Sequence, residues 1–218
     1  PRRSETTGLS FIEFASRGEE AQRLGNYLES MGFSKIGKHK NKAADLYQQG
    51  DIRIVLNQEI SGHAATQWNA RGTTVCDIGI EVASARDTLE RAAHLGNSSF
   101  NQPQEEDELD IPAVRGLSGS VIHFVGNENG MDRLWETEFS QTAGREGFGL
   151  RNIDHLAQTM SYDDMLSWSL FYTSLFEMKK SPMVDVFDPD GLVRSQVVET
   201  ADGSLRVTLN GADTHRTL

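Results

Sequence analysis

The sequence has 218 residues, of which 24% are charged and 37% hydrophobic, a balance typical of a globular protein with a sizeable core. A net charge of −11 argues against nucleic acid or an anionic membrane as the main partner, because phosphate groups are bound by Lys and Arg. Cys76 is the only cysteine, which excludes an internal disulfide framework, and no apolar run approaches the roughly 18 residues of a membrane span. We therefore expect a cytoplasmic protein.

The chain opens with PRRSETTG, a polar stretch typical of a linker, which we assign to residues 1–7. LSFIEFAS (9–16) then alternates apolar and polar residues and predicts a strand. The run at 19–32 has apolar residues at helical spacing and a glycine at its end, so it predicts a helix. Three further strands follow, at FSKIGKHK (33–40), ADLYQQ (44–49) and IRIVLN (52–57).

A second unit with the same order begins after a short connecting helix at 63–70. Its strand TVCDIGIEV (74–82) reads as buried, so Cys76 is expected to be an inert packed thiol. ARDTLERAAHLG (85–96) predicts a helix, and LDIPAVRG (109–116) and GSVIHFVG (119–126) predict strands. The acidic run QEEDELD (104–110) between them is expected to be a solvated loop.

The pattern restarts near residue 150. LRNIDHLAQ (150–158) predicts a strand, YDDMLSWSLFYTSLF (162–176) a helix, and VRSQVVET (193–200) and SLRVTLN (204–210) two strands joined by an Asp-Gly turn. Glu13 precedes Phe33 by 20 residues and His155 precedes Phe176 by 21, while RIVLN ends at Asn57 and RVTLN ends at Asn210. The chain therefore contains repeated β-α-β-β-β units.

A single β-α-β-β-β unit cannot cover both faces of its own sheet, so two units are expected to pair into an open, eight-stranded half-barrel with its helices outside. We therefore predict an α+β fold with a two-unit first barrel at 8–149. Residues 150–218 then form the first unit of a second, truncated barrel. That unit would expose an apolar sheet face and an open edge.

The order and spacing of several pieces resemble the 4-hydroxyphenylpyruvate dioxygenases of the vicinal-oxygen-chelate (glyoxalase-like) superfamily. The resemblance covers nearly the whole chain and rests on FIEFAS, MGFSKIGKHKNKAADLYQQGDIRIVLN, VCDIGIEV, ELDIPAVRGLSGS, IDHLAQTM with WSLFYTSLF, and the run from Ser195 to Asn210. The chain is also similar to the dioxygenase-like half of bacterial two-part 3-dehydroshikimate dehydratases. There a sugar-isomerase-like barrel comes first, and PRRSETTG would be the linker behind it.

The resemblance implies an Fe(II) site, or a site for another divalent metal, in the intact parent. His155 of the IDH motif matches the first of three ligands, and the other two would lie beyond the C-terminus. Two histidines and a carboxylate occupy one face of Fe(II) and leave the other positions for a keto acid and O₂. Ser195 and Asn210 match substrate-binding positions. Thr208 and Gly211 depart from the family, which usually has a proline and an acidic residue there.

Three functions remain open at this point. The parent is an Fe(II) dioxygenase that decarboxylates and oxidises an aromatic 2-keto acid. Alternatively, this region is an accessory half of a bifunctional 3-dehydroshikimate dehydratase, with a binding or oligomerisation role. The third alternative is a non-catalytic scaffold or dimerisation module. In each case we expect a homo-oligomer, and the partner of the first two is a small aromatic or cyclic keto acid.

The repeat also suggests a site in the first barrel. Superposing the copies puts Glu13 on the position of His155, and carrying the family's missing unit onto the first copy puts Asp77 and His123 at the other two ligand positions. Two carboxylates and an imidazole could hold a metal. They could equally form a buried polar cluster in which His123 is charged by the acids. The remaining histidines have no partner at ligand spacing: His39, His63, His94 and His215.

Overall fold

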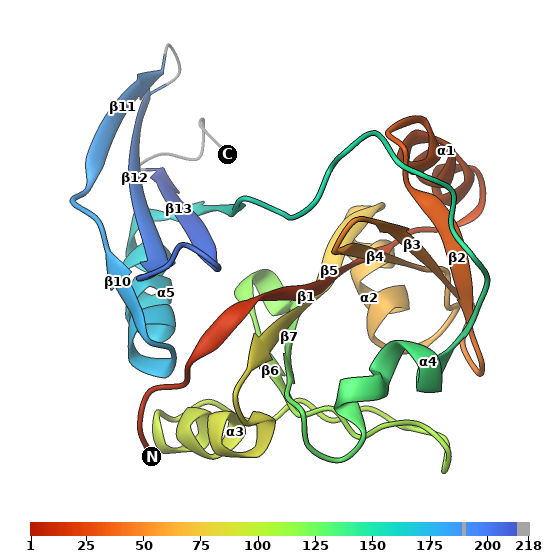
Figure 1. The fold of residues 1–218 in the computed structure, drawn as a ribbon. Coiled ribbons are helices and arrows are strands. Elements are labelled where there is room, and N and C mark those ends of the chain that lie inside the picture. Colours follow the sequence, from red (N-terminus) through yellow and green to blue (C-terminus); the bar gives the residue numbers. More distant parts are fainter. Residues whose placement is uncertain (189–190, 213–218) are drawn as a thin grey trace.

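A computed structural model describes residues 1–188 and 191–212 and contains the predicted repeat of β-α-β-β-β units (Figure 1). The first unit consists of β1 (Thr6–Ala15), α1 (Gly18–Ser30), β2 (Ser34–His39), β3 (Ala44–Gln49) and β4 (Ile52–Asn57). The connecting helix α2 (Gly62–Arg71) leads to the second unit, which consists of β5 (Thr74–Val82), α3 (Ala85–His94), β6 (Ala113–Arg115) and β7 (Val121–Val125). α4 (Leu134–Glu138) and β8 (Phe139–Gln141) follow this unit. The third consists of β9 (Leu156–Ser161), α5 (Tyr162–Leu175), β10 (Met178–Lys180), β11 (Val184–Asp188), β12 (Gly191–Thr200) and β13 (Arg206–Ala212).

The first two units share one eight-stranded sheet, in the order β6-β7-β5-β1-β4-β3-β2-β8. The third unit forms a second sheet, β10-β12-β13-β9, with β11 paired to β12. In every unit the first strand lies parallel to the last one, as β1 with β4, β5 with β7 and β9 with β13. The predicted α+β half-barrel of repeated units is therefore confirmed.

Three details of the sheets differ from the sequence prediction. The strand expected at 109–116 shrinks to β6, and a single bridge from Ser99 to Val114 stands where the unit's other strand would begin. The eighth strand is instead β8, which pairs with β2 at the opposite edge of the sheet. Last, the third unit's first strand starts at Leu156, so His155 lies just before β9 rather than within it.

The late start of β9 has a local cause. The side-chain carbonyl of Gln49 accepts hydrogen bonds from the backbone N–H groups of Phe148 and Leu150, at 2.6 and 3.3 Å. The Asp51 N–H donates to the Arg151 carbonyl at 2.9 Å. Residues 148–151 are thus bound to the β3–β4 turn of the first half-barrel, and the pairing of β9 with β13 begins only at Leu156.

Helices cover the outer face of the large sheet. α1 buries Ala21 and Leu28 against Tyr47 and Leu56 of β3 and β4. α2 packs over Cys76, which is fully buried, and burial raises the pKa of this thiol far above its usual range. The prediction that Cys76 is packed in the core is confirmed. No helix in the described part of the chain is both long and apolar enough to cross a membrane.

The second sheet packs against the first half-barrel through α5. The Phe124 ring of β7 meets the Phe176 ring edge-on, with centroids 6.1 Å apart, and both residues are fully buried. Arg91 of α3 donates to the Ser174 carbonyl at 2.7 Å. One hydrophobic cluster therefore runs through both sheets. The apolar face expected to be open is covered on this side, and the opposite face of the second sheet is the exposed one.

Candidate functional site

The inner face of the eight-stranded sheet encloses a cavity of about 480 Å³. Strand alternation sends Ile12, Ile78 and Ile122 outward to the core and their neighbours inward to the cavity. The inward side chains at its polar end are Glu13 of β1, Asn57 of β4, Asp77 of β5 and His123 of β7. All three residues of the predicted first-barrel cluster thus line one cavity.

Asp77 and His123 form a buried ion pair. Nδ1 of His123 lies 2.7 Å from Oδ2 of Asp77, and the two side chains are 15% and 8% exposed, respectively. Burial acts to lower the pKa of His123, but Asp77 and Glu13 outweigh it and raise that pKa. Burial also raises the pKa of Asp77, and His123 offsets only part of the shift. The other carboxylate oxygen of Asp77, Oδ1, is buried without a hydrogen-bond partner.

Glu13 stands beside this pair. Its Oε1 accepts a hydrogen bond from the Asn57 amide at 2.9 Å and a weaker one from the Cys76 thiol at 3.5 Å. Burial, followed by the charge of Asp77, raises the pKa of Glu13 to about 7. Glu13 does not form a three-ligand group with Asp77 and His123, because their ligand atoms do not all lie within 4.8 Å of one another. The arrangement is a polar cluster rather than a formed metal site.

Among the described residues, the group that does meet that spacing is His39, Glu108 and Glu138, at the other end of the cavity. The contacts of His39 oppose a metal, because its Nδ1 accepts backbone N–H groups from Asn41 and Lys42 at 3.1 Å. The proton of the neutral ring must then sit on Nε2, which lies 3.3 Å from Glu138. Sequence spacing gave no sign of this partner for His39.

Lysines neutralise the two acids of that group. Lys42 lies 2.9 Å from Glu108, and Lys40 lies 3.4 Å from Glu138. A cation placed among these groups would meet two ammonium charges and the Nε2 proton of His39. We therefore interpret the group as an ion-pair network that fixes the cavity wall.

The acidic run at 104–110 is a loop with five exposed residues, as predicted, but Glu108 and Leu109 turn inward and form part of that wall. The Glu108 side chain is only 2% exposed. Asp107 accepts a hydrogen bond from the Asn41 amide at 2.8 Å, and its carbonyl accepts one from Lys40. Basic residues on the β2–β3 turn thus hold the acidic segment over the cavity, and Leu109 and Ile111 face inward.

The position of Phe11 in the cavity depends on Gly79 of β5. A Cβ at Gly79 would lie 2.3 Å from two atoms of the Phe11 ring. We predict that Gly79→Ala destabilises the protein by about 1–3 kcal/mol, measured by urea denaturation, because the ring must leave its place. Phe11→Ala with Gly79→Ala should cost less than the sum of the single changes. Strictly additive costs would contradict this account.

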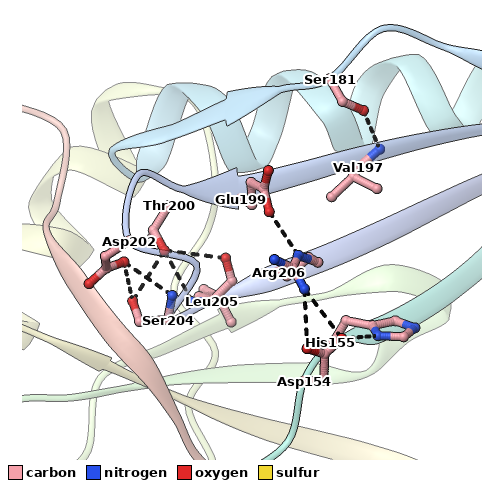
Figure 2. Close-up of polar contacts among 10 residues, drawn as sticks. All are labelled: Asp154, His155, Ser181, Val197, Glu199, Thr200, Asp202, Ser204, Leu205 and Arg206. Carbon is pink, nitrogen blue, oxygen red and sulfur yellow. Dashed lines mark hydrogen bonds and ion pairs between the residues drawn. The ribbon is translucent and has the colours of Figure 1, made fainter.

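The exposed face of the second sheet carries the predicted metal and substrate residues. His155 Nδ1 lies 2.8 Å from Asp154, whose carboxylate meets Arg206 at 3.2 Å, and Arg206 donates to Glu199 at 2.7 Å (Figure 2). These contacts hold the Nδ1 edge of the His155 imidazole against Asp154. If Nδ1 holds the proton, Nε2 has a free lone pair, as in a histidine that ligates a metal.

Ser195 and Asn210 lie directly opposite each other on β12 and β13. The alternating burial of these strands puts both on the face away from α5, the face that also carries His155. Asn210 pairs with Thr159, four residues beyond His155, so the pair lies about 13 Å along the sheet from the histidine. The structure brings Ser195 and Asn210 together and leaves His155 at a distance from them.

The ladders also correct the superposition of Glu13 on His155. Glu13 lies opposite Val55, and Ala157 lies opposite Thr208. When RIVLN is matched to RVTLN, Glu13 therefore corresponds to Ala157, two residues beyond His155. A shift of two residues keeps the side chain on the same face, so the sequence pattern could not reveal it. His215 lies outside the described residues.

Comparison with known families agrees with this architecture. Residues 3–140 match the family model described as hydroxyphenylpyruvate dioxygenase, N-terminal. The chain belongs to this family. It is also 35% identical to a 3-dehydroshikimate dehydratase of Pseudomonas aeruginosa, over 100% of this chain and 34% of that protein. A 4-hydroxyphenylpyruvate dioxygenase of Pseudomonas sp. (strain P.J. 874) is 28% identical over 93% of this chain and 57% of its own length.

Solved structures give the same result. A xylose isomerase-like TIM barrel/4-hydroxyphenylpyruvate dioxygenase fusion protein superposes with a TM-score of 0.84 at 34% identity, over 100% of this chain and 34% of the fusion protein. A variant of 4-hydroxymandelate synthase from Streptomyces coelicolor reaches 0.78 at 16% identity, over 95% of this chain and 63% of its own, and shows the fold alone. This chain of the hydroxyphenylpyruvate dioxygenase family thus spans about a third of the dehydratase and of the fusion protein.

Proposed function

We propose that this chain is part of a non-haem Fe(II) enzyme of the 4-hydroxyphenylpyruvate dioxygenase type, with His155 as one metal ligand. The observation that carries the proposal is the anchoring of its Nδ1 by Asp154, which Arg206 holds in place. A carboxylate on one ring nitrogen fixes the tautomer that leaves the other nitrogen free for a metal. Fe(II), when bound, supplies the O₂ chemistry that couples loss of CO₂ from a 2-keto acid to oxidation of its aromatic ring.

The residues of this chain have separate tasks in the proposal. Asp154 and Arg206 orient the imidazole, so that little rotational freedom is lost when a metal binds. Ser195 and Asn210 offer a hydroxyl and an amide from adjacent strands to the polar groups of an aromatic keto acid. Since they stand about 13 Å from His155, they suit the end of the substrate remote from the metal.

A second candidate is an accessory role in a bifunctional 3-dehydroshikimate dehydratase. It is favoured by the identity of 35% over the whole chain. A feature of β13 points the same way. A Cβ at Gly211 would lie 2.7 Å from Met165 and 3.1 Å from the Tyr162 backbone, so the acidic residue usual in the dioxygenases does not fit there. In this case the region binds a ligand or supports assembly, and the dehydration takes place elsewhere in the parent.

The intact parent with His155→Ala distinguishes the two functions. In the dioxygenase, O₂ uptake with 4-hydroxyphenylpyruvate and added Fe(II) is expected to fall at least 10³-fold, because a ligand of the metal is lost. In the dehydratase, formation of the aromatic product from 3-dehydroshikimate, followed by its ultraviolet absorbance, should stay within twofold. His94→Ala, on the exposed end of α3, is the matched control. A parent that shows neither activity would reject both assignments.

The 218-residue chain alone is expected not to retain Fe(II) through desalting. Among the described residues, His155 belongs to no group of three ligand atoms with metal spacing, and one imidazole competes poorly with water and buffer. Metal analysis after anaerobic loading measures this directly. Stoichiometric iron that disappears with His155→Ala would show the expectation to be wrong.

A further inference from the structure

The cavity of the first half-barrel contains an acceptor without a donor. Oδ1 of Asp77 is buried and accepts no hydrogen bond. The Asp77 side chain is only 8% exposed, so bulk water does not supply the missing donor. An unsatisfied buried acceptor is costly, and most such groups are paired with protein, water or a ligand. The Asn57 amide, which lines the same end of the cavity, donates to Glu13. Nδ1 of His123 lies 2.7 Å from Oδ2 and is also buried without a well-aligned hydrogen bond, so it gives Oδ1 no donor.

We propose that this cavity binds a small molecule with an apolar, ring-sized body and a protonated amine, whose ammonium group lies on Asp77 and Glu13. Two carboxylates face one imidazole here, so a cationic donor gains both a hydrogen bond and charge. The site differs from the open face around His155, and the proposal does not depend on the reaction of the parent.

The rest of the cavity suits the apolar body of such a ligand. Its walls include Phe11, Val55, Leu109, Ile111, Leu134 and Trp135. The Phe11 and Trp135 rings meet edge-on with centroids 5.7 Å apart and form a corner of the cavity. A volume of about 480 Å³ lies within the range of small-molecule sites, roughly 300–1,000 Å³. One aromatic ring with a short side chain fits this space.

The charges of the cavity discriminate against an anion. Lys42 is the lysine in the lining, and Glu108 neutralises it at 2.9 Å. At the polar end a ligand carboxylate would face Asp77 and Glu13 with His123 as its single cationic neighbour, and that imidazole is already paired with Asp77. A 2-keto acid is thus disfavoured here. Ser61, Gly62, Gln102 and Pro103 line the cavity and are exposed to solvent.

Three ligands that share one ring test the proposal on the full chain by calorimetry at pH 8. 2-Phenylethylamine, which is protonated at this pH, should bind at least tenfold more tightly than the neutral 2-phenylethanol. 3-Phenylpropanoate should show no binding. Binding of 3-phenylpropanoate as tight as that of 2-phenylethylamine, or tighter, would overturn the proposal that the site prefers a cationic group. Absence of binding by all three at millimolar concentration would mean that the cavity holds only water.

Two variants locate the ligand. Asp77→Asn should weaken amine binding at least tenfold, whereas the same change at Asp87, whose side chain is 64% exposed on α3, should have no effect. Ala44 is buried in the cavity wall, opposite Asn57 on β4, so Ala44→Leu adds a larger side chain to the wall while Asp77 and His123 stay unchanged. The leucine variant should keep its melting temperature and lose amine binding. Unchanged affinity in either folded variant would refute the site.

Discussion

Glu13→Gln is expected to make the protein more stable than the unchanged chain at pH 8, by up to about 3 kcal/mol. Burial raises the pKa of Glu13 from 4.5 to about 7, and Asp77, His123, Asn57 and Cys76 are the groups that face it. The folded chain therefore binds this proton more tightly than the unfolded chain. Its stability is highest below the unfolded pKa and falls as the pH rises from about 4.5 to 7. A glutamine can still accept the amide hydrogen bond of Asn57 and has no proton to lose.

Urea denaturation of both proteins between pH 4.5 and 8 measures the effect. The advantage of the variant should be small at pH 4.5, grow through pH 7 and level off above it. Glu106→Gln removes the same charge from the exposed part of the acidic segment and should leave the pH profile unchanged. Parallel profiles for Glu13→Gln and the unchanged chain would show that Glu13 titrates as it does in water.

Phe124→Ala is expected to cost about 3–5 kcal/mol of unfolding free energy, because it empties a fully buried site in the cluster shared by both sheets. The ring also loses its edge-on contact with Phe176. Since that contact joins the first half-barrel to α5, the loss should loosen both parts. Hydrogen exchange should quicken in α3 and in α5 together.

Phe187→Ala is the matched control, because it removes the same ring from a position that is 84% exposed on β11. Its effect should remain within about 0.5 kcal/mol. If Phe124→Ala accelerates exchange in α3 alone, the second sheet is stable without the first half-barrel, and the shared cluster contributes little to it.

Hydrophobic periodicity predicted those helices and strands whose formation depends on local sequence. β1, α1, β4 and α5 each follow from spacing within about fifteen residues, and the repeated order of units follows from their succession. β8 has three residues and exists because it meets β2, about a hundred residues earlier. No local signal marks such a strand, and the same holds for the short β10.

The candidate sites divide in the same way. That Glu13, Asp77 and His123 line one cavity could be anticipated, because each lies on a strand whose face the alternation defines. The inward position of Glu108 could not be anticipated, because an acidic run predicts solvation and Lys42, which neutralises Glu108, lies on a turn far away in the sequence. A register shift of two residues separates Glu13 from the position of His155. Such a shift keeps every side chain on the same face, so the alternation along a strand cannot reveal it.

The parallel pairing of each unit's first and last strands has a consequence for how such chains can grow. Because β1 lies beside β4, β5 beside β7 and β9 beside β13, the chain enters and leaves each unit at neighbouring strands. A gene that duplicates one unit in tandem therefore adds a foldable module without rerouting the backbone of its neighbours. Side chains on the inner face of one module can then diverge, from metal ligands to an ion pair like Asp77–His123, while its sheet remains intact.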